Sequence, residues 1–202
     1  MPKHDIVVVG ASAGGLAALS SLCRDLPQNL PAAIFIVMHV SPNYPSLLPD
    51  ILSRSGKLPV HHGVGGEPIR LGRIYVAPPD HHMVLEADRV RITKGPKENR
   101  SRPAVDTLFR SAAYTYGPRA IGVVLTGTLD DGTAGLWAIK DRGGITIIQD
   151  PEEAEHASMP LNARQHVSID YCLPLAQIAR TLARLVEQRE WGGFSNADRL
   201  GN

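Results

Sequence analysis

Near its N-terminus the chain reads Asp5-Ile-Val-Val-Val-Gly10-Ala-Ser12-Ala-Gly14-Gly15, and this segment determines the class of fold that we expect. Its four consecutive β-forming residues, 6–9, are typical of a strand buried on both faces. The glycines on either side of Ser12 allow a tight turn. Residues 16–22 follow with apolar side chains at helical spacing. The pattern predicts a buried strand, a sharp turn with a serine at its apex, and a helix.

This turn has two functional interpretations. A serine between a strand and a helix is the setting of a nucleophile elbow, where the helix N-terminus offers N–H groups to a developing oxyanion. A glycine-rich turn after a first strand also binds dinucleotide phosphates. However, Gly10, Gly14 and Gly15 do not match the Gly-x-Gly-x-x-Gly spacing, and the next strand ends in a histidine, not an acid. We therefore favour a catalytic Ser12 over nucleotide binding, with a purely structural turn as the remaining alternative.

The composition indicates an ordinary globular protein. The chain has 202 residues, of which 43% are hydrophobic and 20% charged, enough for one domain with a substantial core. Its formal net charge of +1 gives no basic field for nucleic acid or an anionic membrane. Without a long apolar run or a signal-peptide layout, we expect a cytoplasmic protein with no membrane insertion. Cys23 and Cys172 are expected to be small buried apolar residues.

A second apolar strand, residues 32–38, ends in His39. Two buried strands joined by a helix form a βαβ unit, which implies a parallel sheet with a right-handed crossover. Functional groups gather at the carboxyl ends of the strands in such sheets. We therefore expect His39 at the same edge of the sheet as Ser12.

The rest of the chain fits a single-domain, doubly wound α/β fold with a mainly parallel sheet and helices on both faces, spanning residues 1–190. Residues 191–202 lack periodicity and are expected to form a mobile tail. The further core strands and helices that we predict cover residues 74–77, 120–126 and 144–149 (strands) and 46–53, a segment opening near Pro103, 136–142, 150–154 and 175–189 (helices). Short runs at 83–85 and 90–93 predict an antiparallel β-hairpin.

Two histidine pairs, His61-His62 and His81-His82, lie in the segment 58–94, which contains the predicted hairpin. Adjacent strand residues point to opposite faces, so neither pair readily holds one metal ion. We interpret them as turn or surface residues, although His81 or His82 would be near enough to line the functional edge. We expect no metal and no cofactor.

A third strand end brings a carboxylate to the same edge. The strand 120–126 runs into Gly127-Thr-Leu-Asp-Asp131-Gly132 and then a helix. An aspartate there is commonly a helix N-cap. Together, however, Ser12, His39 and Asp131 supply a nucleophile, a base and a group that orients the base. Their order, Ser…His…Asp, differs from the Ser…Asp…His order of α/β-hydrolases.

Successive blocks of the sequence resemble the protein-glutamate methylesterase family of bacterial chemotaxis. They follow in order over about residues 5–186, at 7–16, 37–39, 74–81, 101–106, 125–132 and 148–160. The resemblance implies a parallel α/β fold and a serine esterase that removes methyl groups from glutamate side chains on the cytoplasmic helices of chemoreceptors. For some members it also implies deamidation of receptor glutamines.

The same resemblance implies a role for individual residues. Ser12 would be the nucleophile, His39 the general base and Asp131 the orienting acid, with Asp130 at a variable position. We expect backbone N–H groups at Ala13 and near Thr128 to form the oxyanion hole. Arg102, and with it Arg110, is a candidate for holding receptor carboxylates.

The sequence departs from the family pattern in two ways. The family commonly has Thr-Gly-Met-Gly-x-Asp-Gly where this chain has Thr128-Leu129 at the third and fourth positions. If that position needs a positive φ, Leu129 is strained or the loop bends differently, which would affect the aim of Asp131. The chain also begins at the catalytic strand, without the receiver domain of the well-known members. Constitutive activity, a regulator acting in trans and a longer parent protein all stay open.

Two other functions compete with a receptor methylesterase. The first is a non-catalytic binding module of the same fold, which the Thr128-Leu129 departure favours and the intact Ser, His and Asp disfavour. The second is a serine hydrolase that acts on another ester or amide.

Overall fold

The fold is built on a seven-stranded sheet with strand order β3-β4-β2-β1-β7-β8-β9, in which every pair of neighbours is parallel. The computed structural model describes residues 4–41 and 44–187, so the predicted tail, 191–202, lies outside the described residues. The strands are β1 Ile6–Ala11, β2 Ala33–Met38, β3 Val60–His62, β4 Arg73–Val76, β7 Ala120–Val124, β8 Ile145–Gln149 and β9 Tyr171–Leu173.

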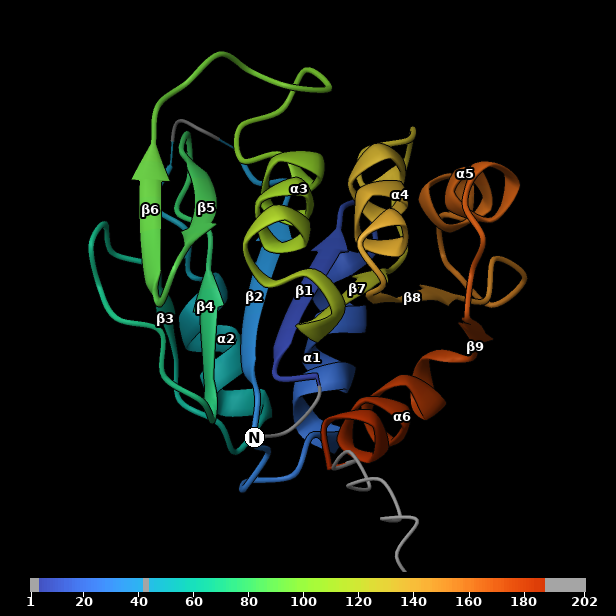
Figure 1. The fold of residues 1–202 in the computed structure, drawn as a ribbon, viewed down its shortest axis with the longest axis horizontal. Helices are drawn as coiled ribbons and strands as arrows, with labels where there is room; N and C mark the ends of the chain where they lie inside the picture. The colour runs from blue at the N-terminus through green and yellow to red at the C-terminus, as the bar shows by residue number, and fades with distance from the viewer. Residues whose placement is uncertain (1–3, 42–43, 188–202) are drawn as a thin grey trace, which may run out of the picture.

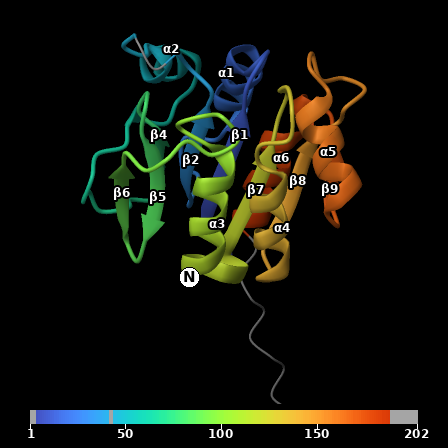
Figure 2. The ribbon, with the colours of Figure 1, turned by 90° about the horizontal axis from the view of Figure 1, so that it is seen from above.

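Helices cover both faces of this sheet, as Figures 1 and 2 show. Helices α1 Gly15–Asp25, α2 Leu48–Ser55 and α6 Leu175–Glu187 pack on one face. Helices α3 Val105–Tyr116, α4 Thr133–Asp141 and α5 Ser158–His166 pack on the other. The short 3-10 helix η1, Gly117–Arg119, leads into β7. The predicted doubly wound α/β fold is confirmed. No helix in the described part combines the length and the apolar character that spanning a bilayer requires.

The apolar runs of the sequence become strands because both of their faces are buried. In β1, Val7 and Val9 belong to the core under α1 and α6, while Ile6 and Val8 belong to the core under α3 and α4. Each of these four side chains is at most 1% exposed. Alternating side chains of β1 thus fill the cores on both faces of the sheet. A strand with one exposed face would place polar residues at every second position, and β1 has no such face.

The predicted hairpin is also present. Strands β5 His82–Glu86 and β6 Arg89–Thr93 pair antiparallel, and Asp88 turns between them with φ 60°. The hairpin packs on α3, where the Leu85 N–H donates to Ser111 Oγ (2.9 Å) and Thr115 Oγ1 donates to Leu85 O (2.9 Å).

Several local predictions were wrong. Residues 150–154 form a turn, in which the Glu152 N–H donates to Asp150 Oδ1 at 3.0 Å, and not the predicted helix. Helix α5 and strand β9 were not predicted, because α5 buries only Met159, Pro160 and Ala163 and shows little apolar periodicity. Strand β3, which contains one of the histidine pairs, extends the sheet by a further edge strand.

Burial of individual residues also differed in places. Cys23 is buried as predicted, and burial raises the pKa of its thiol to about 12. Cys172 is exposed, because it lies on the edge strand β9. His82 is 2% exposed and is neither a turn nor a surface residue; its Nε2 bonds to Pro96 O (2.8 Å), and its Nδ1 accepts from the Ala104 N–H (3.2 Å).

The close contact between β1 and α3 generates a stability prediction. A Cβ at Gly10 would lie 2.3 Å from Val105 Cγ1, on a stiff β-branched side chain at the start of α3. We expect Gly10→Ala to lower the free energy of unfolding by about 1–3 kcal/mol, measured by urea denaturation. The control is Gly95→Ala, whose Cβ would meet nothing within 4 Å. Equal stability of the two variants would contradict this packing.

Candidate active site

Three neighbouring strands bring the predicted residues together. Ser12 follows β1, His39 follows β2, and Asp131 lies in the loop between β7 and α4. Because β2, β1 and β7 are adjacent and parallel, these three segments meet at one edge of the sheet (Figure 1). His39 Nδ1 lies 3.0 Å from Ser12 Oγ, and His39 Nε2 lies 2.8 Å from Asp131 Oδ2.

This geometry specifies how the imidazole of His39 works. A neutral ring whose Nδ1 accepts from the Ser12 hydroxyl carries its hydrogen on Nε2, and that N–H donates to Asp131. The His39 side chain is 20% exposed and Asp131 only 2%. The arrangement can take a proton from Ser12 and stabilise the resulting imidazolium with a buried carboxylate.

The elbow around Ser12 is fixed by the acid loop. The Ser12 N–H donates to Thr126 O (3.0 Å), and Thr126 Oγ1 donates to Ala13 O (3.0 Å). Gly14 adopts φ 73° immediately before α1, a conformation that favours glycine. A Cβ at Gly127 would lie 2.9 Å from Ser12 Cβ and 2.0 Å from Met159 Sδ, so only a glycine lets this loop approach the serine so closely.

Asp131 is held as an anion inside the protein. Its Oδ2 accepts from His39 and the Val105 N–H (2.8 Å), and its Oδ1 accepts from the Asp106 N–H (3.0 Å) and Asn99 Nδ2 (2.7 Å). Burial alone raises the pKa of this carboxyl, but the hydrogen bonds from His39 and from the backbone of Asp106 and Val105 outweigh it, and the net pKa is lowered. The carboxylate is therefore ionised at neutral pH.

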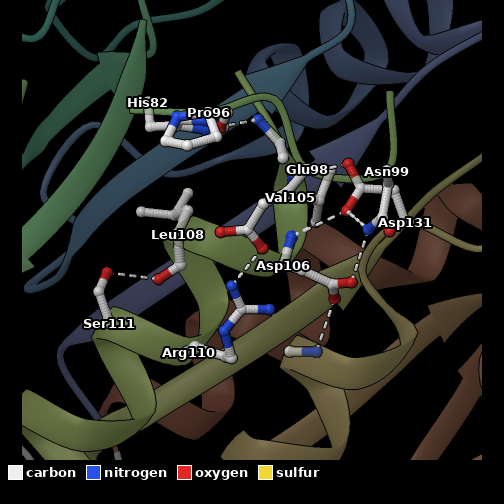
Figure 3. A network of polar contacts seen from close by, with 12 residues as sticks. His82, Pro96, Glu98, Asn99, Val105, Asp106, Leu108, Arg110, Ser111 and Asp131 are labelled. Carbon is white, nitrogen blue, oxygen red and sulfur yellow. Dashed lines mark hydrogen bonds and ion pairs between the residues drawn. The ribbon is translucent and has the colours of Figure 1, made fainter. Parts of the chain in front are cut away.

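Asp106 forms the counterpart of this arrangement, as Figure 3 shows. Its Oδ1 accepts from the N–H groups of Gly132 (3.0 Å) and Gly135 (2.6 Å) at the start of α4. Burial raises the pKa of Asp106, the Gly135 N–H opposes that rise, and the charge of Asp131 adds to it. Asp131, just before α4, thus accepts hydrogen bonds at the start of α3, and Asp106, in α3, accepts them at the start of α4. The sequence analysis did not predict this reciprocal capping.

Leu129, which stands where the family commonly has glycine, adopts a left-handed backbone conformation in this loop. Leu129 adopts φ 67°, and its side chain is 58% exposed. Asn162 Nδ2 donates to Leu129 O at 3.0 Å. The loop therefore keeps a conformation that suits glycine, with a leucine in it, and Asp131 still reaches His39.

Three of the other predicted residues, Ala13, Thr128 and Arg102, lie close to Ser12 or His39 in the chain, through a neighbouring residue or in a shared cavity. Ala13 follows Ser12, and the exposed Thr128 follows Gly127, which lies against Ser12. Arg102 lines a cavity of about 90 Å³ with His39. Its guanidinium already bonds to Asp80 Oδ1 through Nε (2.9 Å) and Nη2 (2.6 Å), and to Gly95 O through Nη1 (2.7 Å). Arg110 pairs with Glu98.

A larger cavity adjoins the nucleophile. It has a volume of about 490 Å³ and is lined by Ser12, Leu16, Met38, Ile51 and Glu155, among others. Its walls are mostly apolar, so a small neutral group of a substrate would fit beside the serine hydroxyl. Within residues 4–41 and 44–187, no group of three or more His, Cys, Asp or Glu side chains is placed to hold a metal ion.

Comparison with known proteins gives concordant matches. A family model described as CheB methylesterase matches residues 7–182. A protein of Leptospira interrogans is 37% identical over 192 residues, which is 93% of this chain and 100% of the relative. The protein-glutamate methylesterase/protein-glutamine glutaminase 2 of Anaeromyxobacter dehalogenans is 39% identical over 91% of this chain and 54% of its own length. The fold is similar to the crystal structure of the Thermotoga maritima CheB methylesterase catalytic domain, with a TM-score of 0.87 and 36% identity, covering 91% of this chain and 99% of that one.

The conformation of Leu129 is testable through stability. A left-handed conformation costs an L-residue roughly 1–2 kcal/mol, whereas glycine adopts it freely. We expect Leu129→Gly to raise the free energy of unfolding by about 1 kcal/mol, measured in urea. Leu129→Ala removes the same exposed side chain but keeps Cβ, so it should gain little. If both variants gain equally, the effect comes from the lost leucine surface and not from the backbone.

Proposed function

The chain belongs to the CheB methylesterase family, and from this premise we propose that it is a serine esterase that hydrolyses glutamate methyl esters on chemoreceptors. The observation that carries the proposal is the unbroken hydrogen-bonded line from Ser12 Oγ through both nitrogens of His39 to Asp131. A relative named both methylesterase and glutaminase supports deamidation of glutamine by the same residues.

The first half of the reaction forms an acyl-enzyme. Ser12 Oγ attacks the ester carbonyl carbon while its proton passes to His39 Nδ1, and Asp131 stabilises the imidazolium through Nε2–H. We expect the N–H group of Ala13 and one near Thr128 to donate to the oxyanion of the tetrahedral intermediate. When this intermediate collapses, His39 returns the proton to the departing methoxide. Methanol leaves, and the glutamyl group is esterified to Ser12.

The second half restores the enzyme. Water attacks the glutamyl ester, its proton is taken by His39 Nδ1, and the second tetrahedral intermediate collapses with proton return to Ser12 Oγ. The product is a glutamate carboxylate. For a glutamine substrate the same steps release ammonia in place of methanol.

We also propose where and on what the enzyme acts. The substrate is a methylated cytoplasmic helix of a chemoreceptor, and the enzyme works in the cytoplasm as part of chemotaxis signalling. The partial exposure of His39 and the cavity beside Ser12 support access by a protein-sized substrate. A non-catalytic module is less well supported, because the Thr128-Leu129 departure leaves Asp131 bonded to His39.

Methanol release from methylated receptor tests the proposal directly. We expect wild-type protein to release methanol and Ser12→Ala to lower the rate by more than about a thousandfold, since the nucleophile is lost. Ser21→Ala, a serine substitution within α1, is the matched control and should keep the wild-type rate.

The negative outcome can also be resolved. If wild-type protein releases no methanol from several receptors, the substrate is wrong, and a serine-reactive phosphonate then distinguishes the two alternatives. An adduct on Ser12 would indicate a hydrolase for another ester or amide, and its absence would indicate a binding module.

Asp131→Asn tests the orienting acid. An asparagine at this position no longer favours the Nε2–H tautomer of His39, so we expect kcat for methanol release to fall by about 10⁴-fold. The lowered pKa of Asp131 also stabilises the fold above the ordinary pKa of an aspartate, and this contribution is lost as the pH falls through the lowered value. The variant should therefore lose less stability between neutral and acidic pH than wild type, measured by urea unfolding. A wild-type kcat would exclude this role.

A further inference from the structure

We propose that Asn99 is a positioning residue: it fixes the carboxylate of Asp131 by bridging it to the second buried carboxylate, Asp106. The inference rests on the proposed function, in which Asp131 orients His39. Asn99 lies outside the Ser12–His39–Asp131 line and is separated from Asp131 by 32 positions in the chain.

The bridge is made by a single amide nitrogen. Asn99 Nδ2 lies 2.7 Å from Asp131 Oδ1 and 2.7 Å from Asp106 Oδ2. An amide nitrogen carries two hydrogens, so each carboxylate receives one N–H. Figure 3 shows the Asn99 side chain between the two aspartates.

The Asn99 amide donates to the carboxylate oxygen of Asp131 that does not contact His39. Val105 and Asp106 donate from the backbone of α3, which fixes where the carboxylate sits. Among the described residues, the side chains that donate to Asp131 are His39 on Oδ2 and Asn99 on Oδ1. Asn99 therefore holds the oxygen opposite the histidine. It also places N–H groups between two buried like charges, which would otherwise repel each other across the gap.

The loop that carries Asn99 is strained and held in place. Asn99 and Arg100 adopt φ 48° and 63°, two successive left-handed residues that are not glycine. The backbones of Glu98 and Ser101 pair with each other (3.1 and 2.8 Å), and the Glu98 side chain pairs with Arg110 on α3. Buried His82 bonds to Pro96 O in the same loop. These contacts hold Asn99 in an unfavourable backbone conformation. In this conformation the Asn99 side chain reaches Asp131.

Asn99 is also separate from the cavity beside the nucleophile. Asn99 and Asp106 line a different cavity of about 410 Å³, together with Trp137 on α4, whereas the cavity at Ser12 is lined by α1, Met38 and Glu155. A substitution at Asn99 should therefore change the rate of the chemical step and not the binding of substrate.

The test compares two Asn99 variants with a matched control. Asn99→Gly removes the amide but accepts the positive φ, and Asn99→Asp keeps the size while replacing the donor with a third carboxylate. Asp88→Gly likewise replaces a left-handed residue that is not glycine, here in the β5–β6 turn and not in the loop that carries Asn99. For each protein we would measure kcat and KM for methanol release, and the rate at which Ser12 displaces fluoride from a fluorophosphonate. The NMR resonance of the His39 Nε2–H proton is the third readout.

We expect Asn99→Gly to lower kcat and the fluorophosphonate rate by about 10- to 100-fold with KM unchanged, because the hydrogen bond that Asn99 donates to the Asp131 carboxylate is lost. Asn99→Asp should lower both further. The Nε2–H resonance should shift or broaden in both variants and stay unchanged in Asp88→Gly. A merely structural role would leave that resonance at its wild-type position.

Two results would overturn the inference. One is an Nε2–H resonance in Asn99→Gly identical to that of wild type; this readout needs no substrate, so it holds even if the proposed esterase activity fails. The other is a wild-type protein that reacts with the fluorophosphonate while both Asn99 variants react within twofold of it. If the wild type releases no methanol but reacts with the probe, the substrate assignment fails and the role of Asn99 is still decided by the other two readouts.

Discussion

Two buried aspartates, Asp106 in α3 and Asp131 in the loop before α4, accept hydrogen bonds from N–H groups at the starts of these two helices. Asp131 accepts from the N–H groups that begin α3, and Asp106 accepts from those that begin α4. Burying a carboxylate is costly unless several donors surround it, and the first turn of a helix supplies such donors together with a favourable dipole. The same contacts join α3 to α4 on one face of the sheet. The packing of α3 against α4 and the orientation of Asp131, the proposed acid, therefore depend on one set of hydrogen bonds.

The position of Ser12, the proposed nucleophile, is fixed by close contacts with the start of α3 and with the loop that carries Asp131. Gly10 in β1 lies against Val105, the residue whose N–H donates to Asp131, and Gly127 in the acid loop lies against Ser12. Strand β1, which ends just before Ser12, and the start of α3 therefore pack so closely that there is no room for a side chain at Gly10. Close packing of this kind transmits small displacements, so the relative positions of Ser12 and Asp131 are set by the core and not by the loops alone.

The central architecture and the line from Ser12 to Asp131 could be predicted from the sequence because their signals are local. Runs of apolar residues mark strands buried on both faces, and polar residues at the ends of parallel strands gather at one edge. The parts that escaped prediction depend on tertiary contacts. Helix α5 buries few side chains, and β9 has only three residues. The bonds from Asn99 to Asp131, from Gly135 to Asp106 and from His82 to Pro96 join residues 32, 29 and 14 positions apart, and a single sequence carries no periodic signal for them.

The exposed Cys172 illustrates how tertiary position overrides residue type. Free cysteines are usually buried, and Cys23 in α1 follows that tendency. Cys172 has the same chemistry but lies on the last strand of the sheet, where one side of the backbone has no neighbouring strand in the described part of the chain. Topology, which the local sequence does not encode, decides its exposure.

Both edge strands of the large sheet, β3 and β9, contain only three residues. An open edge presents unpaired N–H and C=O groups to which a strand of another molecule can add, and such addition leads to aggregation. Three residues offer too few hydrogen bonds to hold a foreign strand, whereas the longer central strands, β1 and β2, are paired on both sides. The short strands at both margins therefore leave few backbone groups for a foreign strand to pair with, which protects a highly apolar sheet against edge-to-edge aggregation.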